Sequence, residues 1–291
     1  MLPHKHTKEG VLNEKLALKK LLTYMKSVYK IPQKIKCLTD ERKRKSIPLF
    51  NIVMPVLLFL MLQYESFHTI FSTPESMSKR LKNCISGRIP KVDAVRDLLS
   101  RINPDEIRSI HEEMIDIIKR NRVFREGTIG GYVVAGLDGV ELFCSTKKSC
   151  PNCLSRKKHT GETEYFYRSV VCMIIGKSPH VILGQEMLKP RDGSGKDEGE
   201  LTGGKRLIEQ LKKRHGHFAD VIVADALYLN APFINTLKEN GLEGVIRLKD
   251  ERRMIFQDAE RLFKQDEGKK ASFWKGKKKI EVWDLSGFKM E

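Results

Sequence analysis

The sequence of this 291-residue chain predicts a mixed α/β fold preceded by a mainly helical N-terminal region. Two observations carry the prediction. Up to about residue 125 the apolar residues recur at helical spacing, whereas after Gly127-Thr-Ile-Gly-Gly131 they form short runs rich in β-branched residues. These runs then alternate with helical stretches, and strands followed by a helix, a strand, a helix and a strand are typical of a mixed sheet flanked by helices.

The first part of the chain is predicted to be helical from its periodicity. Residues 11–30 form a basic amphipathic pattern, and Ile47–Leu62 is an apolar segment that suits a buried helix. In Pro104–Arg120 the apolar residues mark one face, and the proline stands in the first turn, where it is tolerated. A further helix is expected over Lys91–Ile102, and a polar break over Ser72–Ser78.

Beyond Gly127 the strands are predicted from short β-branched or aromatic runs bounded by glycine or proline. Helices are expected over Leu201–Arg214 and Met254–Phe263, and a third begins at the capping residue Asn230 and closes at Asn240-Gly241. The predicted strands are Tyr132–Leu137, Val140–Cys144, Tyr165–Ile175, His180–Leu188, Asp220–Ala224 and Val245–Leu248, and Ala271–Leu285 returns to a strand pattern.

The chain is strongly basic. It carries 54 Lys and Arg against 37 Asp and Glu, a net charge of +17. Residues 1–48 alone hold 13 basic and 4 acidic residues, so they supply +9 of this excess. Such a charge suits a polyanionic partner, either nucleic acid or an anionic membrane surface, although a solvated basic tail would account for the N-terminal part.

The apolar segment Ile47–Leu62 follows Arg42-Lys43-Arg44-Lys45, as a cytoplasmic anchor would. It spans only 16 residues, short of the roughly 20 that a bilayer requires. Asn51 and Pro55 also interrupt it. We therefore expect a buried helix and no membrane partner. Because Met1–Lys20 is polar and lacks the apolar core of a signal peptide, a reducing cytoplasmic location is expected.

Two aspartates stand at comparable places in the predicted sheet. Asp138 follows the strand Tyr132–Leu137, and Asp225 follows Val221-Ile-Val-Ala224. Ligand chemistry gathers at strand ends, and two neighbouring carboxylates would present hard oxygens to Mg²⁺ or Mn²⁺. Each has an alternative interpretation, since Asp138-Gly139 is also a two-residue hairpin signal and Asp225 could begin a helix.

Several short motifs resemble the DDE-type transposases of insertion sequences. The residues Val134-Ala-Gly-Leu-Asp-Gly-Val-Glu-Leu-Phe143 look like the strand of the first aspartate. Val181-Ile-Leu-Gly-Gln185, Gly195-Lys-Asp-Glu-Gly-Glu-Leu201, Val221-Ile-Val-Ala-Asp-Ala-Leu-Tyr228 and Gly244-Val-Ile-Arg-Leu-Lys249 follow in the family's order. Each motif is short, and their order and spacing carry the resemblance, which covers roughly residues 85–265.

The resemblance implies a ribonuclease-H-like fold and cut-and-paste DNA chemistry. Asp138 and Asp225 match the family's first two metal ligands, with Mg²⁺ or Mn²⁺ as the cofactor. A metal-activated water would cut one strand at the element's end, and the freed 3′-hydroxyl would attack target DNA. The partner is then DNA, at element ends and target, in a nucleoid-associated cytoplasmic protein, and a homodimer is left open.

The third catalytic acid of the resembling families lies on a helix beyond a β-rich insertion. Ala271–Leu285 looks like the start of that insertion, and Glu291 is the last residue. The sequence therefore predicts a truncated copy that lacks the third acid and is inactive alone. Glu260, on the helix after Val245–Leu248, is the alternative within the chain, although a surface glutamate would equally fit its amphipathic pattern.

Cys150-Pro-Asn-Cys153 has the spacing of a pair of zinc ligands, with Cys144 six residues before it and His159 six after. These four side chains could close a small tetrahedral zinc site, but a lone pair of this kind equally fits reduced thiols in a loop. Glu198 and Glu200 precede a helix, whose dipole favours acids there. An accessory role near the metal is the alternative for these two glutamates.

We thus expect three parts: a basic, mainly helical region that binds DNA (1–126), a ribonuclease-H-like catalytic core (127–268), and the start of a truncated β-rich insertion (269–291). The predicted function is that of a DNA transposase, incomplete in this copy. The alternatives are a non-catalytic DNA-binding remnant or regulator of transposition, and a zinc-dependent nucleic-acid-binding module.

Overall fold

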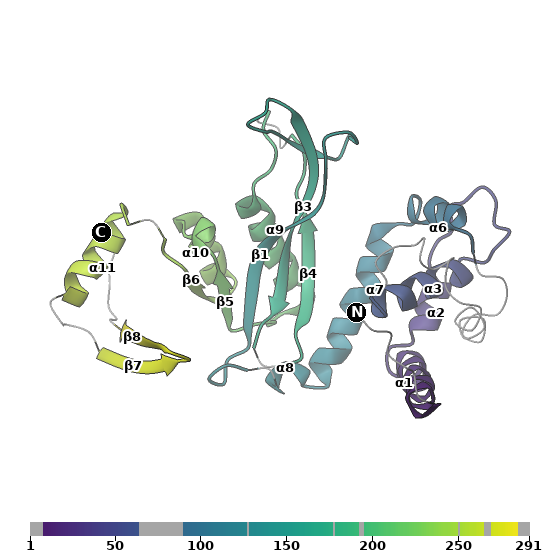
Figure 1. The fold of residues 1–291 in the computed structure, drawn as a ribbon, viewed down its shortest axis with the longest axis horizontal. Coiled ribbons are helices and arrows are strands. Elements are labelled where there is room, and N and C mark those ends of the chain that lie inside the picture. The colour runs from purple at the N-terminus through teal and green to yellow at the C-terminus, as the bar shows by residue number, and fades with distance from the viewer. Residues whose placement is uncertain are drawn as a thin grey trace. The chain divides into compact units, whose positions relative to one another are not determined.

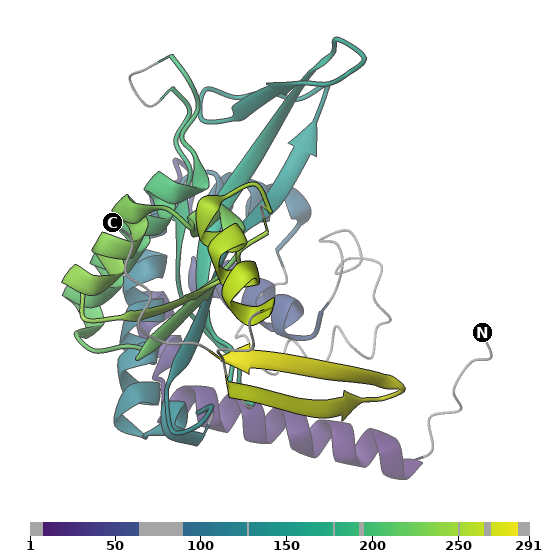
Figure 2. The same cartoon turned by 90° about the vertical axis from the view of Figure 1, so that its left-hand side faces the viewer.

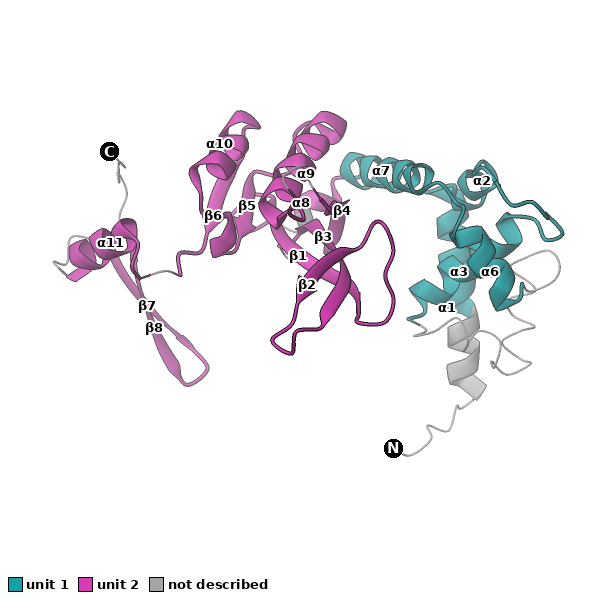
Figure 3. Ribbon diagram, turned by 90° about the horizontal axis from the view of Figure 1, so that it is seen from above, with its two compact units in different colours: residues 1–121 teal, residues 122–291 magenta. Residues whose placement is uncertain are grey.

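The structure is a computed structural model that describes residues 8–63, 90–126, 128–176, 178–191, 195–249, 251–264 and 269–284. It divides into two compact units, residues 1–121 and residues 122–291 (Figure 3). The predicted polar break Ser72–Ser78 lies outside the described residues.

The N-terminal unit is helical, as predicted. Its core is formed by apolar side chains of the short helices and by the buried face of α3, with Ile52, Leu58, Phe59 and Leu98 almost fully buried. None of the described helices is both long and apolar enough to cross a membrane. The helices are α1 (Lys8–Ser27), α2 (Ile31–Lys36), α3 (Phe50–Met61), α6 (Val92–Leu99) and α7 (Pro104–Arg120).

A buried ion pair supports this unit. The Arg42 side chain is only 3% exposed and donates to the Asp40 carboxylate at 2.8 Å and to the Ile47 carbonyl at 2.7 Å. The hydrogen bonds from Arg42 lower the pKa of Asp40. Buried guanidinium groups require such partners, so this pair fixes the chain as it enters α3.

The second unit contains a six-stranded mixed sheet in its described residues, with the order β2-β3-β1-β5-β6 and β4 beside β3 (Figures 1 and 2). β1, β5 and β6 are parallel, whereas β3 runs antiparallel to β1, β2 and β4. This is a ribonuclease-H-like arrangement, as predicted. The strands are β1 (Val134–Ser145), β2 (Leu154–Lys157), β3 (Thr163–Ile174), β4 (Val181–Met187), β5 (Val221–Ala224) and β6 (Glu243–Ile246).

The predicted break between two strands at Asp138-Gly139 is wrong, because β1 continues through it. Asp138 pairs with Val171 and Gly139 with Val170 on β3. An isolated Asp-Gly favours a turn, but the long partner strand β3 satisfies the backbone groups on both sides of it. The hairpin interpretation of Asp138 is therefore excluded.

Two helices pack beside the sheet, α9 (Glu200–His215) and α10 (Ala231–Glu239). α9 buries Leu207, Ile208 and Leu211 and contacts β3, β4 and α10. Gly204 permits its close approach, since a Cβ there would lie 2.9 Å from Cε1 of Tyr228 and 3.3 Å from Cδ2 of Leu137.

The remaining elements of this unit are short. α8 (Val123–Glu126) precedes the sheet, and α11 (Met254–Lys264) has no buried residue. The strand pattern predicted over Ala271–Leu285 corresponds to a hairpin of β7 (Lys269–Lys275) and β8 (Lys278–Asp284), with Gly276 at positive φ in its turn. Trp283 of this hairpin stands 6.5 Å from the Phe263 ring, between ring centroids.

Candidate metal centre

The two predicted aspartates lie side by side in the sheet. β1 and β5 are parallel neighbours, and their last paired residues are Leu137 and Ala224. Asp138 and Asp225 are the next residue on each chain, and the backbone at Asp225 is still extended, with φ −80° and ψ 177°. Neighbouring strands stand about 5 Å apart and residues in register share a face. The backbones of the two aspartates are therefore neighbours at this edge of the sheet.

The backbone holds each aspartate by a local hydrogen bond. Asp138 is exposed, and its Oδ1 accepts from the Gly139 N–H at 2.8 Å. Asp225 Oδ1 accepts from the Leu227 N–H at 2.9 Å and caps the short 3-10 helix η1 (Ala226–Tyr228). Its Oδ2 lies 3.4 Å from Lys249 Nζ. Asn230 caps α10 as predicted, by accepting from the Phe233 N–H at 3.0 Å.

A third carboxylate, that of Glu200, lies close to this pair. Glu200 is the first residue of α9 and its side chain is 14% exposed. Its Oε1 accepts from Arg168 Nη1 at 2.9 Å. Burial raises the pKa of Glu200, and the charges of Asp138 and Asp225 raise it further against the opposing effect of Arg168. The three acids therefore share one electrostatic environment.

A buried tyrosine lies next to the same acids. Tyr228, at the end of η1, is fully buried, and its ring stands 5.0 Å from that of Phe233. Its hydroxyl has no hydrogen-bond partner among the described residues. Burial raises the pKa of this hydroxyl, followed by the charges of Glu200, Asp138 and Asp225. An unpaired buried donor beside three carboxylates is costly unless a further group completes its hydrogen bonds.

The donor set fits a hard divalent cation. Magnesium is held in proteins by one or two carboxylates together with water and substrate phosphates, and an adjacent aspartate pair meets this requirement. The Asp225 side chain is 46% exposed, so a solvated ion can reach it. Within the described residues, no three His, Cys, Asp or Glu side chains converge closely enough to hold a metal by themselves.

Glu198 lies two residues from Glu200 but has a different environment. Its carboxylate accepts from Arg206 Nη1 at 2.5 Å and from the Lys189 N–H at 2.8 Å. Burial opposes its ionisation, but the hydrogen bonds from Arg206 and Lys189 outweigh burial, and the pKa of Glu198 is lowered. Arg206 also donates to Glu186 at 2.6 Å. Glu198 therefore fixes the loop before α9.

Glu260, the in-chain alternative for the third acid, lies on α11. Its side chain is 54% exposed, and its Oε1 stands 3.1 Å from Lys264 Nζ, one turn further along the helix. This is the pairing of a surface glutamate on an amphipathic helix. A catalytic role for Glu260 stays a prediction.

The structure brings together two of the four predicted zinc ligands, Cys150 and Cys153. Sγ of Cys150 lies 2.9 Å from Sγ of Cys153 and 2.6 Å from the Tyr167 hydroxyl. Hydrogen bonds from Cys153 and then Tyr167 lower the pKa of Cys150. Cys144, on β1, and His159 are both exposed. The four-ligand zinc site stays a prediction.

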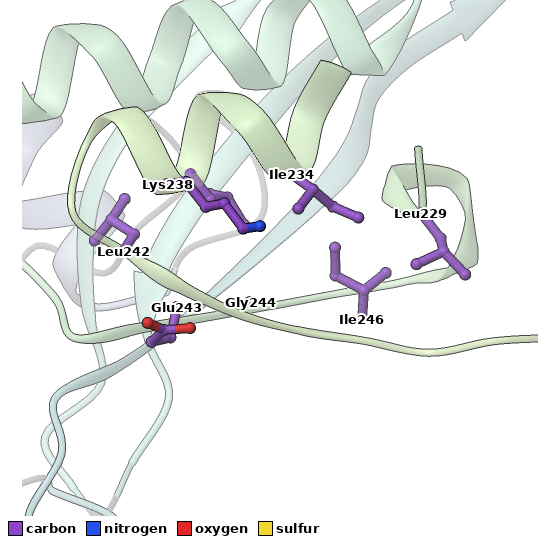
Figure 4. Close-up of a pocket in the computed structure, with 8 residues that line it drawn as sticks. Leu229, Ile234, Lys238, Leu242, Glu243, Gly244 and Ile246 are labelled. Atoms are coloured by element: carbon purple, nitrogen blue, oxygen red, sulfur yellow. The ribbon is translucent and has the colours of Figure 1, made fainter. Parts of the chain in front are cut away.

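A separate pocket lies between α10 and β6 (Figure 4). It measures about 250 Å³, and its lining is mainly aliphatic, with Ile234, Leu242 and Ile246 beside Lys238 and Glu243. Neither predicted aspartate lines it. It is therefore distinct from the candidate metal centre.

A ribonuclease-H-like sheet that carries acids in register on neighbouring parallel strands is typical of a class of enzymes that act on nucleic acids. Residues 149–287 match the family model of the transposase DDE domain. This match spans a little under half of the chain, and together with the fold it supports the resemblance to DDE-type insertion-sequence transposases. The matched range includes Glu200 and Asp225 and begins eleven residues after Asp138. No curated protein and no solved structure gave a match.

Proposed function

We propose that this protein is a DDE-type transposase that cuts DNA at the ends of an insertion sequence and joins the freed 3′-hydroxyl to target DNA, with Asp138 and Asp225 as ligands of Mg²⁺ or Mn²⁺. One observation carries the proposal. The two acids follow residues that pair directly between parallel neighbours β1 and β5. Such strands form a rigid frame, and rigid placement of ligands is required for phosphoryl transfer.

The chain's own residues have three roles in this mechanism. Asp138 and Asp225 hold the cation, which when bound supplies activation of water and stabilisation of the attacking and leaving oxygens. Lys249, 3.4 Å from Asp225, adds positive charge beside the phosphodiester. The net charge of +17 attracts the DNA backbone, so binding should weaken steeply as salt rises.

The partners in this proposal are the element-end DNA and the target DNA, and the protein acts in the cytoplasm at the nucleoid. The homodimer left open by the sequence belongs to the same proposal. Sedimentation of the full chain with and without element-end DNA tests it. A monomer under both conditions would contradict the homodimer.

Nicking of labelled element-end DNA by the full chain in Mn²⁺ tests the function. Asp138→Asn and Asp225→Asn should each reduce nicking by about a thousandfold or more, as loss of a catalytic electrostatic contact does. Asp258→Asn is the matched control, since Asp258 is a half-exposed aspartate on α11. DNA binding that persists in all variants without any nicking by the unaltered chain would favour the non-catalytic regulator instead.

A further inference from the structure

Glu200 lies closer to the aspartate pair than its place in the sequence suggests. A Cβ at Gly139 would collide with the Glu200 carboxylate, so this carboxylate touches β1 at the residue that follows Asp138. The Glu200 side chain is only 14% exposed, whereas an acid at the start of a helix is usually solvated. The helix dipole alone does not require such burial, because exposed acids benefit from it equally.

The charges around Glu200 are unbalanced. Asp138, Asp225 and Glu200 contribute three negative charges, whereas Arg168 and Lys249 are the cations that pair with them. Lys249 is half exposed and its contact with Asp225 is long, at 3.4 Å. Partly buried carboxylates are stabilised by charge partners, so this environment favours an additional cation.

Tyr228 is an independent observation at the same place. Its side chain is fully buried, and its hydroxyl is without a partner in the described part of the chain. The charged groups that influence this hydroxyl are Glu200, Asp138, Asp225 and Arg168. A phenol in this position can donate to a carboxylate oxygen or to a water on a cation.

From this geometry we propose that Glu200 is a third carboxylate ligand of the cation held by Asp138 and Asp225. The inference rests on the function proposed above and adds a ligand to the same site. Glu200 reaches the cation by rotation about its side-chain bonds, away from Arg168, and three carboxylates then neutralise the ion more fully than two.

Binding of Mn²⁺ to the full chain, measured by calorimetry and by electron paramagnetic resonance, tests this without any need for catalysis. Glu200→Gln should raise the Kd for Mn²⁺ by about tenfold or more, since even partners outside the ligand shell change metal affinity by such factors. Glu209→Gln, which removes the same charge from an exposed site on α9, should leave the Kd within twofold. Glu200→Asp keeps the charge with a shorter reach and should give an intermediate Kd.

The outcomes separate the two proposals. If Asp138→Asn weakens Mn²⁺ binding but Glu200→Gln does not, the role of Glu200 is overturned and the proposed function stands. If neither Asp138→Asn nor Asp225→Asn changes Mn²⁺ binding, the proposed metal centre fails, and the role of Glu200 fails with it. Circular dichroism and thermal unfolding confirm that each variant is folded, and Glu200→Asp still tests the inference if Glu200→Gln is unfolded.

Discussion

The carboxylate of Glu200 occupies the space in which a side chain at Gly139 would stand. Glycine at this point of β1 therefore has a steric reason, which is the approach of α9 to the strand that carries Asp138. The contact joins residues 61 positions apart in the sequence. A substitution at residue 139 can therefore displace the Glu200 side chain without altering any charge.

Gly139→Ala should displace the Glu200 carboxylate and break its 2.9 Å ion pair with Arg168. We expect the Kd for Mn²⁺ to rise by about tenfold. The free energy of unfolding should fall by less than about 1 kcal/mol, because the displaced atoms are the far end of a flexible side chain and the lost ion pair is partly exposed. Calorimetric titration and urea unfolding measure the two effects. Gly199→Ala is the control, since a Cβ there meets nothing within 4 Å. An unchanged Kd in Gly139→Ala would contradict the expected displacement.

Gly204→Ala should destabilise the second unit, residues 122–291, although alanine favours helices. The added methyl would lie 2.9 Å from Cε1 of Tyr228, a ring packed against Phe233 and unable to move freely. We expect a net loss of about 1–3 kcal/mol, after the gain of about 1 kcal/mol that alanine brings to a helix interior. The urea midpoint followed by far-ultraviolet circular dichroism measures it. Stabilisation by Gly204→Ala would show that α9 can move away from Tyr228.

Asp40→Asn should destabilise the N-terminal unit in a manner that depends on pH. The substitution leaves the buried Arg42 without its carboxylate partner, which we expect to cost about 2–4 kcal/mol at neutral pH. The pKa of Asp40 is lowered by Arg42, so its stabilising effect is complete above the unfolded pKa of about 3.9. It is then lost as pH falls through the folded pKa.

Native-state hydrogen exchange at α3 and α7 measures this difference between Asp40→Asn and the unaltered chain. The difference should shrink as the pH is lowered below about 4. Asp105→Asn is the control, because Asp105 is 77% exposed in its pair with Arg108, and loss of an exposed pair should cost less than about 1 kcal/mol. A difference that is the same at pH 7 and pH 3 would contradict the role of the Asp40 charge.

Cys150 should react with iodoacetamide at a lower pH than an ordinary thiol. Its lowered pKa reflects hydrogen bonds from Cys153 and Tyr167, and the thiolate is the reactive form. Tyr167→Phe removes one of these donors and should shift the pH profile of alkylation upward, as followed by peptide mass spectrometry. Tyr165→Phe removes a hydroxyl two residues away along β3 instead and should leave the profile in place. Coincident profiles for the Tyr167→Phe variant and the unaltered chain would exclude Tyr167 as a donor.

Elements with strong local signals could be predicted from the sequence. Helix α7 has the predicted bounds Pro104–Arg120, because Asn103 caps it through the Asp105 N–H and the proline suits its first turn. α2 and β2 were not predicted. They are six and four residues long, too short to show a period.

At the candidate site, the local sequence predicts only part of the arrangement. The positions of Asp138 and Asp225 followed from runs of apolar residues, but the continuity of β1 through Asp138 depends on pairing with the distant β3. Likewise, a glutamate at a helix start is explained locally by the dipole. Only the packing of α9 on β1 brings the Glu200 carboxylate to Gly139, the residue that follows Asp138.

Asp138 lies inside β1, and the residues before and after it both pair with β3. Asp225, in contrast, lies one residue beyond the end of β5. Amides within a paired strand exchange with deuterium slowly, and those of a short turn exchange faster. A cation bound to both acids therefore ties a protected segment to a less protected one. The gain in deuterium protection upon Mn²⁺ binding should fall on the amides from Leu227 to Asn230 and leave those of β1 almost unchanged.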